Sequence, residues 1–210
     1  MNKHSILIAL RLTLSLLTFA AIGRQFAIQM QMGLSILNFF SYFTNLSNLF
    51  AAIVLSFGVF QLVMHREPSI THDLIRGVSA LNMAVVGIVF TLLLRDVDMG
   101  YLLPWVNTVL HYIMPVAIVF EWLLYPPKTR LGARQLLLCQ MFPLLYLLYV
   151  LIRGAVAGWY PYPFLNPTAV NGYGNVAMYV TGIIAIFFFA GWTLLTLGNK
   201  LSRNALGASG

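Results

Sequence analysis

The sequence predicts an all-α, polytopic membrane protein with six transmembrane helices, and composition and hydropathy are the observations behind that prediction. Of the 210 residues, 60% are hydrophobic and 8% are charged, whereas a soluble domain carries about 25% charged residues. Mean hydropathy is +0.85, and the apolar segments approach or exceed the roughly 20 residues that a helix needs to cross a bilayer. The composition therefore excludes an ordinary soluble domain and indicates a single transmembrane domain over residues 1–210.

Each of the six apolar segments is expected to form one helix, because each is long enough to span. The first is not expected to be a cleavable signal peptide, since Arg11 interrupts its apolar run and no convincing small-residue cleavage site follows it. The predicted helices cover residues 5–23, 36–64, 74–94, 102–125, 135–152 and 175–198.

The positions of Lys and Arg predict the orientation, because cytoplasmic loops retain positive charge. With the N-terminus inside, nine such residues fall on the cytoplasmic side and three on the other, so both termini are expected in the cytoplasm. The expected location is the plasma membrane, or the inner membrane of a bacterial cell. Nucleic-acid binding is not expected, since the short cytoplasmic loops offer no suitable basic surface. The nine are Lys3, Arg11, Arg66, Arg76, Lys128, Arg130, Arg134, Lys200 and Arg203, and the three are Arg24, Arg95 and Arg153.

Cysteine and histidine usage argues against redox and metal chemistry. The single Cys139 excludes an intramolecular disulfide, a CxxC pair and a thiolate zinc site. The histidines include no pair at i, i+3 or i+4, so haem and di-iron sites lack ligands. We therefore expect no cofactor and no bound metal. The four histidines are His4, His65, His72 and His111.

Polar residues gather on one face of the predicted second helix and on one face of the fourth. Polar groups in hydrocarbon cost free energy unless they are paired, so such positions carry functional information. At about 1.5 Å per residue, Thr44 and His111 both lie roughly 10 to 14 Å below the outer boundary. The two polar stripes are Ser41, Thr44, Asn45 and Asn48 in the second helix and Asn107, Thr108 and His111 in the fourth.

A hydroxyl and an imidazole at equal depth can act as a nucleophile and its general base. Thr44 and His111 are the candidates, and nearby amides are candidates for stabilising an oxyanion or orienting the imidazole. The alternative is that the hydroxyls bond to their own helix, the amides join helices, and His111 is a neutral core residue. The amide candidates are Asn45, Asn48 and Asn107; Asp96 and Asp98 are further candidates for orienting His111.

Other buried polar residues have structural interpretations. Arg11 and Glu121 lie at similar depth from the cytoplasmic side, which predicts an ion pair. Asn82 and Gln140 are expected to donate hydrogen bonds between helices. Pro115 lies four residues after His111, so the carbonyl of residue 111 is expected to lose its helical donor at a kink.

The outer loop at residues 158–167 contains three prolines and four aromatic residues. The prolines exclude a continuous helix, and the aromatic residues suit the membrane–water interface. We expect this loop either to lie across the outer mouth of the bundle or to serve only as an interfacial anchor.

Three short motifs resemble, in the same order, the androgen-induced protein family, which includes the androgen-dependent regulator of tissue factor pathway inhibitor and has bacterial six-helix relatives. They are the stretch 42–46, the run 107–111 followed by Pro115 and Glu121, and the loop stretch 159–165. Eukaryotic members are intramembrane threonine hydrolases that cleave fatty acid esters of hydroxy fatty acids with one Thr and one His. By motif, the resemblance implies that these are Thr44 and His111.

The predicted function is therefore an intramembrane lipid-ester hydrolase, whose partners are membrane lipids and a lipid-like ester substrate. One alternative is a non-enzymatic protein that binds or transports a small solute or lipid through an outer-leaflet polar cavity. The sequence lacks the inverted repeats of many secondary transporters, which disfavours transport. Another alternative is a non-catalytic membrane scaffold.

Overall fold

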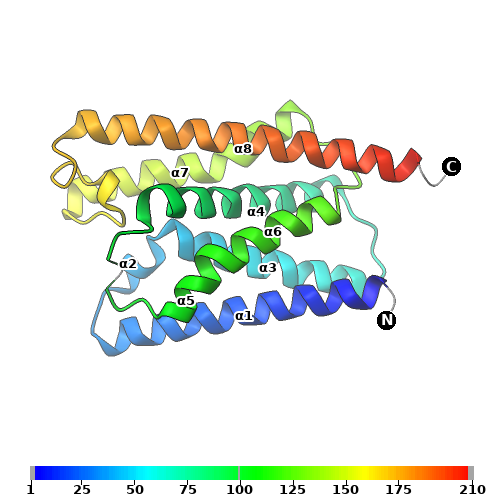
Figure 1. Cartoon of the computed structure of the whole chain (residues 1–210), viewed down its shortest axis with the longest axis horizontal. Coiled ribbons are helices and arrows are strands. Elements are labelled where there is room, and N and C mark those ends of the chain that lie inside the picture. Colours follow the sequence, from blue (N-terminus) through cyan, green and yellow to red (C-terminus); the bar gives the residue numbers. More distant parts are fainter. Residues whose placement is uncertain (1–2, 99, 208–210) are drawn as a thin grey trace.

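The computed structural model describes residues 3–98 and 100–207 and, within them, contains helices and no strands. Six of its helical segments are long and apolar enough to cross a membrane, as the sequence predicts. They run along the longest axis of the molecule, and both ends of the chain lie at the same end of the bundle (Figure 1). The six spans are His4–Gln31, Phe43–Val63, Ile70–Leu94, Pro104–Leu124, Ala133–Ala157 and Tyr173–Arg203.

Several spans consist of more than one helical element. The fourth span changes its helical pitch twice, and the third ends in a π-helical turn. In chain order the elements are α1 (Lys3–Gln31), α2 (Ile36–Phe40), α3 (Phe43–Val63), α4 (Ile70–Val89), the π-helical turn η1 (Phe90–Leu94), α5 (Pro104–Thr108), the π-helical turn η2 (Val109–Ile113), α6 (Met114–Leu124), α7 (Ala133–Ala157), the short 3₁₀ turn η3 (Pro163–Leu165) and α8 (Tyr173–Gly207).

Helix α1 extends well beyond the predicted end at residue 23, to Gln31. The extension carries Gln25, which donates to the carbonyl of Tyr101 at 3.2 Å and accepts from the N–H of Leu103 at 3.3 Å. The loop before α5 thus satisfies the buried Gln25 amide. The helix can therefore continue past residue 23, where the drop in hydropathy predicted its end.

The predicted second helix is interrupted between α2 and α3, so the prediction of one continuous polar stripe from Ser41 is wrong. Ser41 caps the C-terminus of α2, and Tyr42 is extended. The hydroxyl of Tyr146 on α7 donates to the Ser41 carbonyl at 2.9 Å. Asn45 donates to the carbonyl of Phe39 at 2.9 Å. Side chains thus satisfy carbonyls freed by the break, and α3 starts one residue before Thr44.

The amides expected to join helices behave differently from each other. Gln140 on α7 donates to the carbonyl of Phe187 on α8 at 3.3 Å. Asn82 is fully buried in α4, but neither of its side-chain polar atoms has a hydrogen-bond partner among the described residues. The prediction is therefore wrong for Asn82, whose amide faces the core without reaching a neighbouring helix.

A buried ion cluster joins α1, α4 and α6. Arg11 pairs with Glu121 and donates through Nε at 3.0 Å. Arg76 donates to the other carboxylate oxygen at 2.9 Å and to the carbonyl of Tyr125 at 2.6 Å. A carboxylate oxygen of Asp73 lies 3.7 Å from a guanidinium nitrogen of Arg76. The structure thus brings Arg11 and Glu121 together and adds Arg76, which the charge distribution had assigned only to the cytoplasmic side.

The ion cluster predicts unequal effects of removing its members. Glu121→Gln leaves two buried guanidinium groups without their shared carboxylate, and should lower the free energy of unfolding by about 3–5 kcal/mol. Arg11→Gln should cost less, because Arg76 still pairs with Glu121. Thermal unfolding of purified protein in detergent measures both. The control is Glu67→Gln, which removes an exposed pair with Lys128 and should have little effect. Equal losses for Glu121→Gln and Glu67→Gln would contradict the assignment.

Candidate functional site

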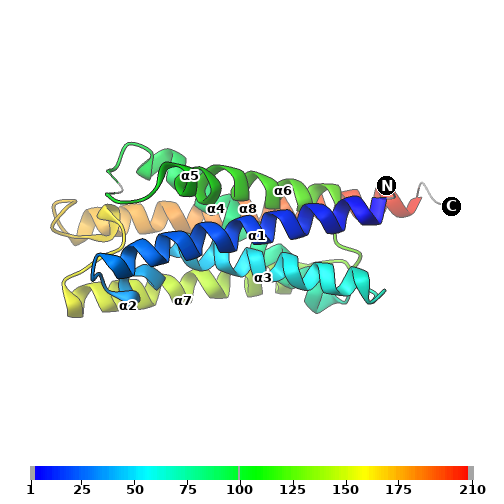
Figure 2. The same cartoon turned by 90° about the horizontal axis from the view of Figure 1, so that it is seen from below.

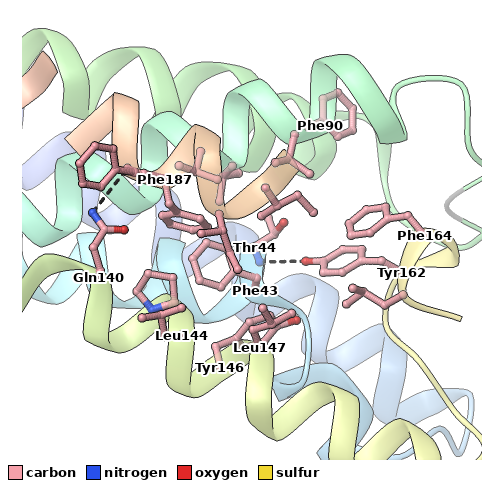
Figure 3. Close-up of a pocket in the computed structure, with 18 of the residues that line it drawn as sticks. Phe43, Thr44, Phe90, Gln140, Leu144, Tyr146, Leu147, Tyr162, Phe164 and Phe187 are labelled. Atoms are coloured by element: carbon pink, nitrogen blue, oxygen red, sulfur yellow. Dashed lines mark hydrogen bonds between the residues drawn. The ribbon is translucent and has the colours of Figure 1, made fainter. Parts of the chain in front are cut away.

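Two cavities that share part of their lining lie near the end of the bundle opposite the termini. The first, of about 260 Å³, lies among apolar side chains of α4, α7 and α8, including Leu144, Leu147 and Phe187 (Figure 3). The second, of about 480 Å³, has many polar side chains in its wall. Thr44 and Tyr162 line both cavities.

Thr44 lies in the first turn of α3, where backbone N–H groups have no partner within the helix. Tyr42, the N-cap residue of α3, makes no side-chain hydrogen bond to this first turn. Instead the N–H of Thr44 donates to the hydroxyl oxygen of Tyr162 at 3.3 Å. Figure 3 shows this hydroxyl pointing from the outer loop towards Thr44. The loop therefore caps the helix that carries the candidate nucleophile.

Tyr162 is a site residue that the sequence analysis did not single out. Its ring stacks on Phe164, with centroids 5.2 Å apart, and meets the ring of Tyr42 edge-on. Burial raises the pKa of Tyr162 above its ordinary value, so the phenol stays protonated at neutral pH. Its hydroxyl also lies beside the side chains of Thr44 and Tyr146, and a phenol can donate as well as accept.

The outer loop does line the cavities. The flanking prolines Pro161 and Pro163 fix the backbone on either side of Tyr162. Tyr162 is only 9% exposed. The Pro-Tyr-Pro sequence was the available signal for Tyr162. A loop that serves only as an aromatic anchor at the membrane–water interface would have the same composition.

His111 lies in η2 and faces the 480 Å³ cavity. Its imidazole stacks on Phe90 of η1, with centroids 4.2 Å apart and planes 22° apart. The two π-helical turns therefore pack against each other at the candidate base. Such turns within helices are frequent at functional sites.

The backbone carbonyl of Asn107 lies beside the imidazole of His111. Nδ1 has no hydrogen bond of good geometry within the described part of the chain. Among the other orienting candidates, Asp98 lines the cavity and accepts from the N–H of Gly100 at 2.8 Å. Asp96 is exposed in the same loop and lines neither cavity. The nearest orienting group is thus a backbone carbonyl, whereas the sequence analysis considered only side chains.

Thr44 and His111 both line the 480 Å³ cavity. They are 7% and 6% exposed, respectively. No hydrogen bond joins their side chains among those of the described residues. The two groups therefore face a common space, in which a substrate atom can lie between them.

The predicted amide candidates occupy different places. Asn45 lines the 480 Å³ cavity. Asn48 is fully buried, and its amide nitrogen donates to the carbonyls of Thr44 at 2.9 Å and Leu110 at 3.1 Å, which uses both of its hydrogens. The side-chain oxygen of Asn107 is buried and has no partner in the described residues. Of the three, only Asn45 presents its side chain to the cavity.

Asn48 compensates for Pro115, although not at the predicted carbonyl. In η2 the N–H of Met114 reaches the carbonyl of Val109, five residues earlier. The next bond in this pattern would join Pro115 to the carbonyl of Leu110, but proline has no N–H. The carbonyl of Leu110 is therefore left without a helical donor, because the π-helical turn shifts the pairing by one residue. Asn48 supplies the missing donor.

No group of three or more His, Cys, Asp or Glu side chains that could hold a metal occurs within residues 3–98 and 100–207. Comparison with known protein families, with curated proteins and with solved structures finds no match to this chain. The interpretation of the site therefore depends on its own geometry.

The bond from Asn48 to Leu110 predicts a coupling between two substitutions. Asn48→Ala should lower the free energy of unfolding by about 1–2 kcal/mol, since it leaves a buried carbonyl without a donor. Pro115→Ala restores a backbone N–H, so Asn48→Ala should cost less in that background. A double-mutant cycle by thermal unfolding measures the difference. Ser56→Ala is the control, because Ser56 bonds only to its own helix. Strictly additive effects of Asn48→Ala and Pro115→Ala would show that the amide does not replace the proline donor.

Proposed function

We propose that this protein is an intramembrane hydrolase of lipid esters, with Thr44 as nucleophile and His111 as general base. The observation that carries the proposal is the position of Thr44, where an apolar cavity meets a more polar one that also contains His111. An ester of a fatty acid has the same division, with an apolar acyl chain on one side of the carbonyl and an alcohol on the other. The resemblance to androgen-induced protein hydrolases supports the same two residues.

In the proposed reaction, the Thr44 hydroxyl attacks the ester carbonyl while His111 accepts its proton. The Tyr162 hydroxyl donates a hydrogen bond to the oxyanion that forms. An uncharged, buried phenol can stabilise this negative charge because little water competes for it. His111 then gives the proton to the departing alkoxide, and the acyl group remains on Thr44. A water molecule, deprotonated by His111, attacks the acyl-threonine, and the proton returns to Thr44 as the fatty acid leaves.

The acyl chain is proposed to occupy the 260 Å³ cavity among α4, α7 and α8. Helices α7 and α8 are the least buried of the six spans. Seen from below, α7 lies at the edge of the bundle (Figure 2). A lipid chain can therefore approach from the bilayer, without first passing through water.

The proposed setting is a multi-pass protein of the plasma membrane, or of the inner membrane if the cell is bacterial, with both termini in the cytoplasm. The charge distribution supports this orientation, and the two cavities then lie in the outer half. Reporter fusions at the C-terminus and in the loop at residues 128–134 should report cytoplasm, and one in the loop at residues 158–172 should report the opposite side. A C-terminal reporter outside the cytoplasm would reverse the proposed orientation.

Substitution of the proposed nucleophile and base separates catalysis from packing. Thr44→Ala and His111→Ala should each remove nearly all ester hydrolysis, and the double variant should be little worse, because residues that act as one unit are strongly non-additive. Thr44→Ser should keep part of the activity, since the hydroxyl remains. The assay uses long-chain esters, including hydroxy-fatty-acid esters, with thermal unfolding measured on the same samples. Activity that survives either alanine substitution would falsify the assignment.

Tyr162→Phe tests the proposed oxyanion donor. It should reduce kcat by about 100-fold or more while KM changes little, because the hydroxyl acts mainly in the transition state. Tyr149→Phe is a matched control, since it removes a phenol that contacts Ser41 but lines neither cavity. Equal losses of kcat in the two variants would indicate a structural role for Tyr162. If the wild type hydrolyses no ester, the binding or transport function becomes the better interpretation of the cavities.

A further inference from the structure

The polar side chains that line the 480 Å³ cavity are almost all uncharged. Most of these side chains are neutral amides and phenols, and Asp98 is the only acidic side chain among the described residues that line the cavity. No Lys or Arg of the described chain lines either cavity. The amides and phenols are Gln25, Gln29, Tyr42, Asn45, Tyr101, Tyr160, Tyr162 and Asn166.

The basic residues on the outer side are placed elsewhere. Arg153 donates to the side chain of Asn38 at 2.5 Å and covers the ring of Trp159 at 4.7 Å. Arg24 and Arg95 are exposed and line neither cavity. A phosphate or carboxylate in the 480 Å³ cavity would therefore have no Lys or Arg partner in the cavity wall, and would meet Asp98.

The amides retain hydrogen-bonding capacity for a neutral ligand. Gln29 is 8% exposed and donates to the carbonyl of Ser35 at 3.0 Å, which leaves its side-chain oxygen and one N–H uncommitted among the described residues. Asn45 likewise uses one N–H, towards Phe39. Hydroxyl groups both donate and accept, so they match such a wall, whereas an anion only accepts.

We propose that the alcohol portion of the substrate is an uncharged polyhydroxy group, of the glycerol or sugar type, bound in the 480 Å³ cavity. This inference rests on the proposed ester hydrolysis at Thr44. It differs from the hydroxy-fatty-acid esters implied by the resemblance, whose alcohol portion carries a free carboxylate. The ester oxygen lies at Thr44, the acyl chain extends into the apolar cavity, and the hydroxyl groups meet the neutral amides and phenols.

Binding to the Thr44→Ala variant in nanodiscs tests the ligand chemistry without turnover. The probes are two non-hydrolysable ethers with the same alkyl chain, hexadecyl glycerol and hexadecyl glycerol phosphate. Hexadecyl glycerol should bind at least about tenfold more tightly, because the phosphate lacks a cation and faces a like charge. Equal or tighter binding of the phosphate, or no binding of hexadecyl glycerol, would overturn the proposal.

Substitution of Asp98, which lines the 480 Å³ cavity, gives a second, independent test. Asp98→Lys introduces a cation at an exposed position and should shift the binding preference towards hexadecyl glycerol phosphate by about tenfold, with Asp98→Asn giving an intermediate preference. An unchanged preference in Asp98→Lys would place the headgroup outside this cavity and overturn the proposal.

Hydrolysis by the wild type separates this proposal from the proposed function. Monopalmitoyl glycerol and the methyl ester of a palmitoylated hydroxystearate should be cleaved at least about tenfold faster than palmitoyl glycerol phosphate and the free acid of that hydroxystearate ester, respectively. Faster cleavage of both anionic esters would overturn the ligand assignment and leave the hydrolase intact. Selective binding of hexadecyl glycerol without hydrolysis of any ester would support the ligand assignment and remove Thr44 as a nucleophile.

Discussion

In a membrane-spanning chain, every backbone group freed from a helix must find a partner within the protein, because hydrocarbon offers none. The half of this molecule away from the termini depends on that constraint at two places. The break before α3 exposes the first-turn N–H of Thr44, and Pro115 exposes the carbonyl of Leu110. Tyr162 satisfies the first group and Asn48 the second. Both partners come from segments distant in sequence, so the same bonds hold this half of the bundle together.

These bonds also connect the two candidate catalytic residues. The amide of Asn48 bridges the carbonyls of Thr44 and Leu110, the latter being next to His111 in the chain. The position of the first turn of α3 relative to η2 is therefore fixed by one fully buried side chain. Thr44 and His111 need not contact each other to be held in register. A space between them is then a stable feature of the fold, available to a substrate carbonyl.

Hydropathy predicted the six spans because burial of apolar surface acts on whole segments of about 20 residues. Hydropathy did not predict the break at Ser41. The donors that compensate for this break are Asn45, on the next helix, and Tyr146, on α7, and hydropathy does not register such contacts. Polar spacing identified Thr44 and His111 as neighbours of one cavity, since helical geometry carries depth information along each span. The role of Tyr162 was not predicted, because a loop has no regular periodicity that shows which way a side chain points. Charge counting grouped Arg76 with the residues on the side of the termini but could not show that Arg76 shares a carboxylate with Arg11.

The distribution of strong interactions explains why the cavities lie where they do. The ion cluster ties α1, α4 and α6 together in the half of the bundle nearer the termini, and the side chains of Arg11, Arg76 and Glu121 are all buried. No member of this cluster belongs to α7 or α8. Those two helices are joined to the rest mainly by apolar packing and by single hydrogen bonds such as that of Trp122 to the carbonyl of Leu194, at 2.9 Å. Dispersion contacts between apolar surfaces can be exchanged for contacts with a lipid chain at little cost in free energy. The α4–α7–α8 interface can therefore hold an acyl group while the ion cluster among α1, α4 and α6 stays intact.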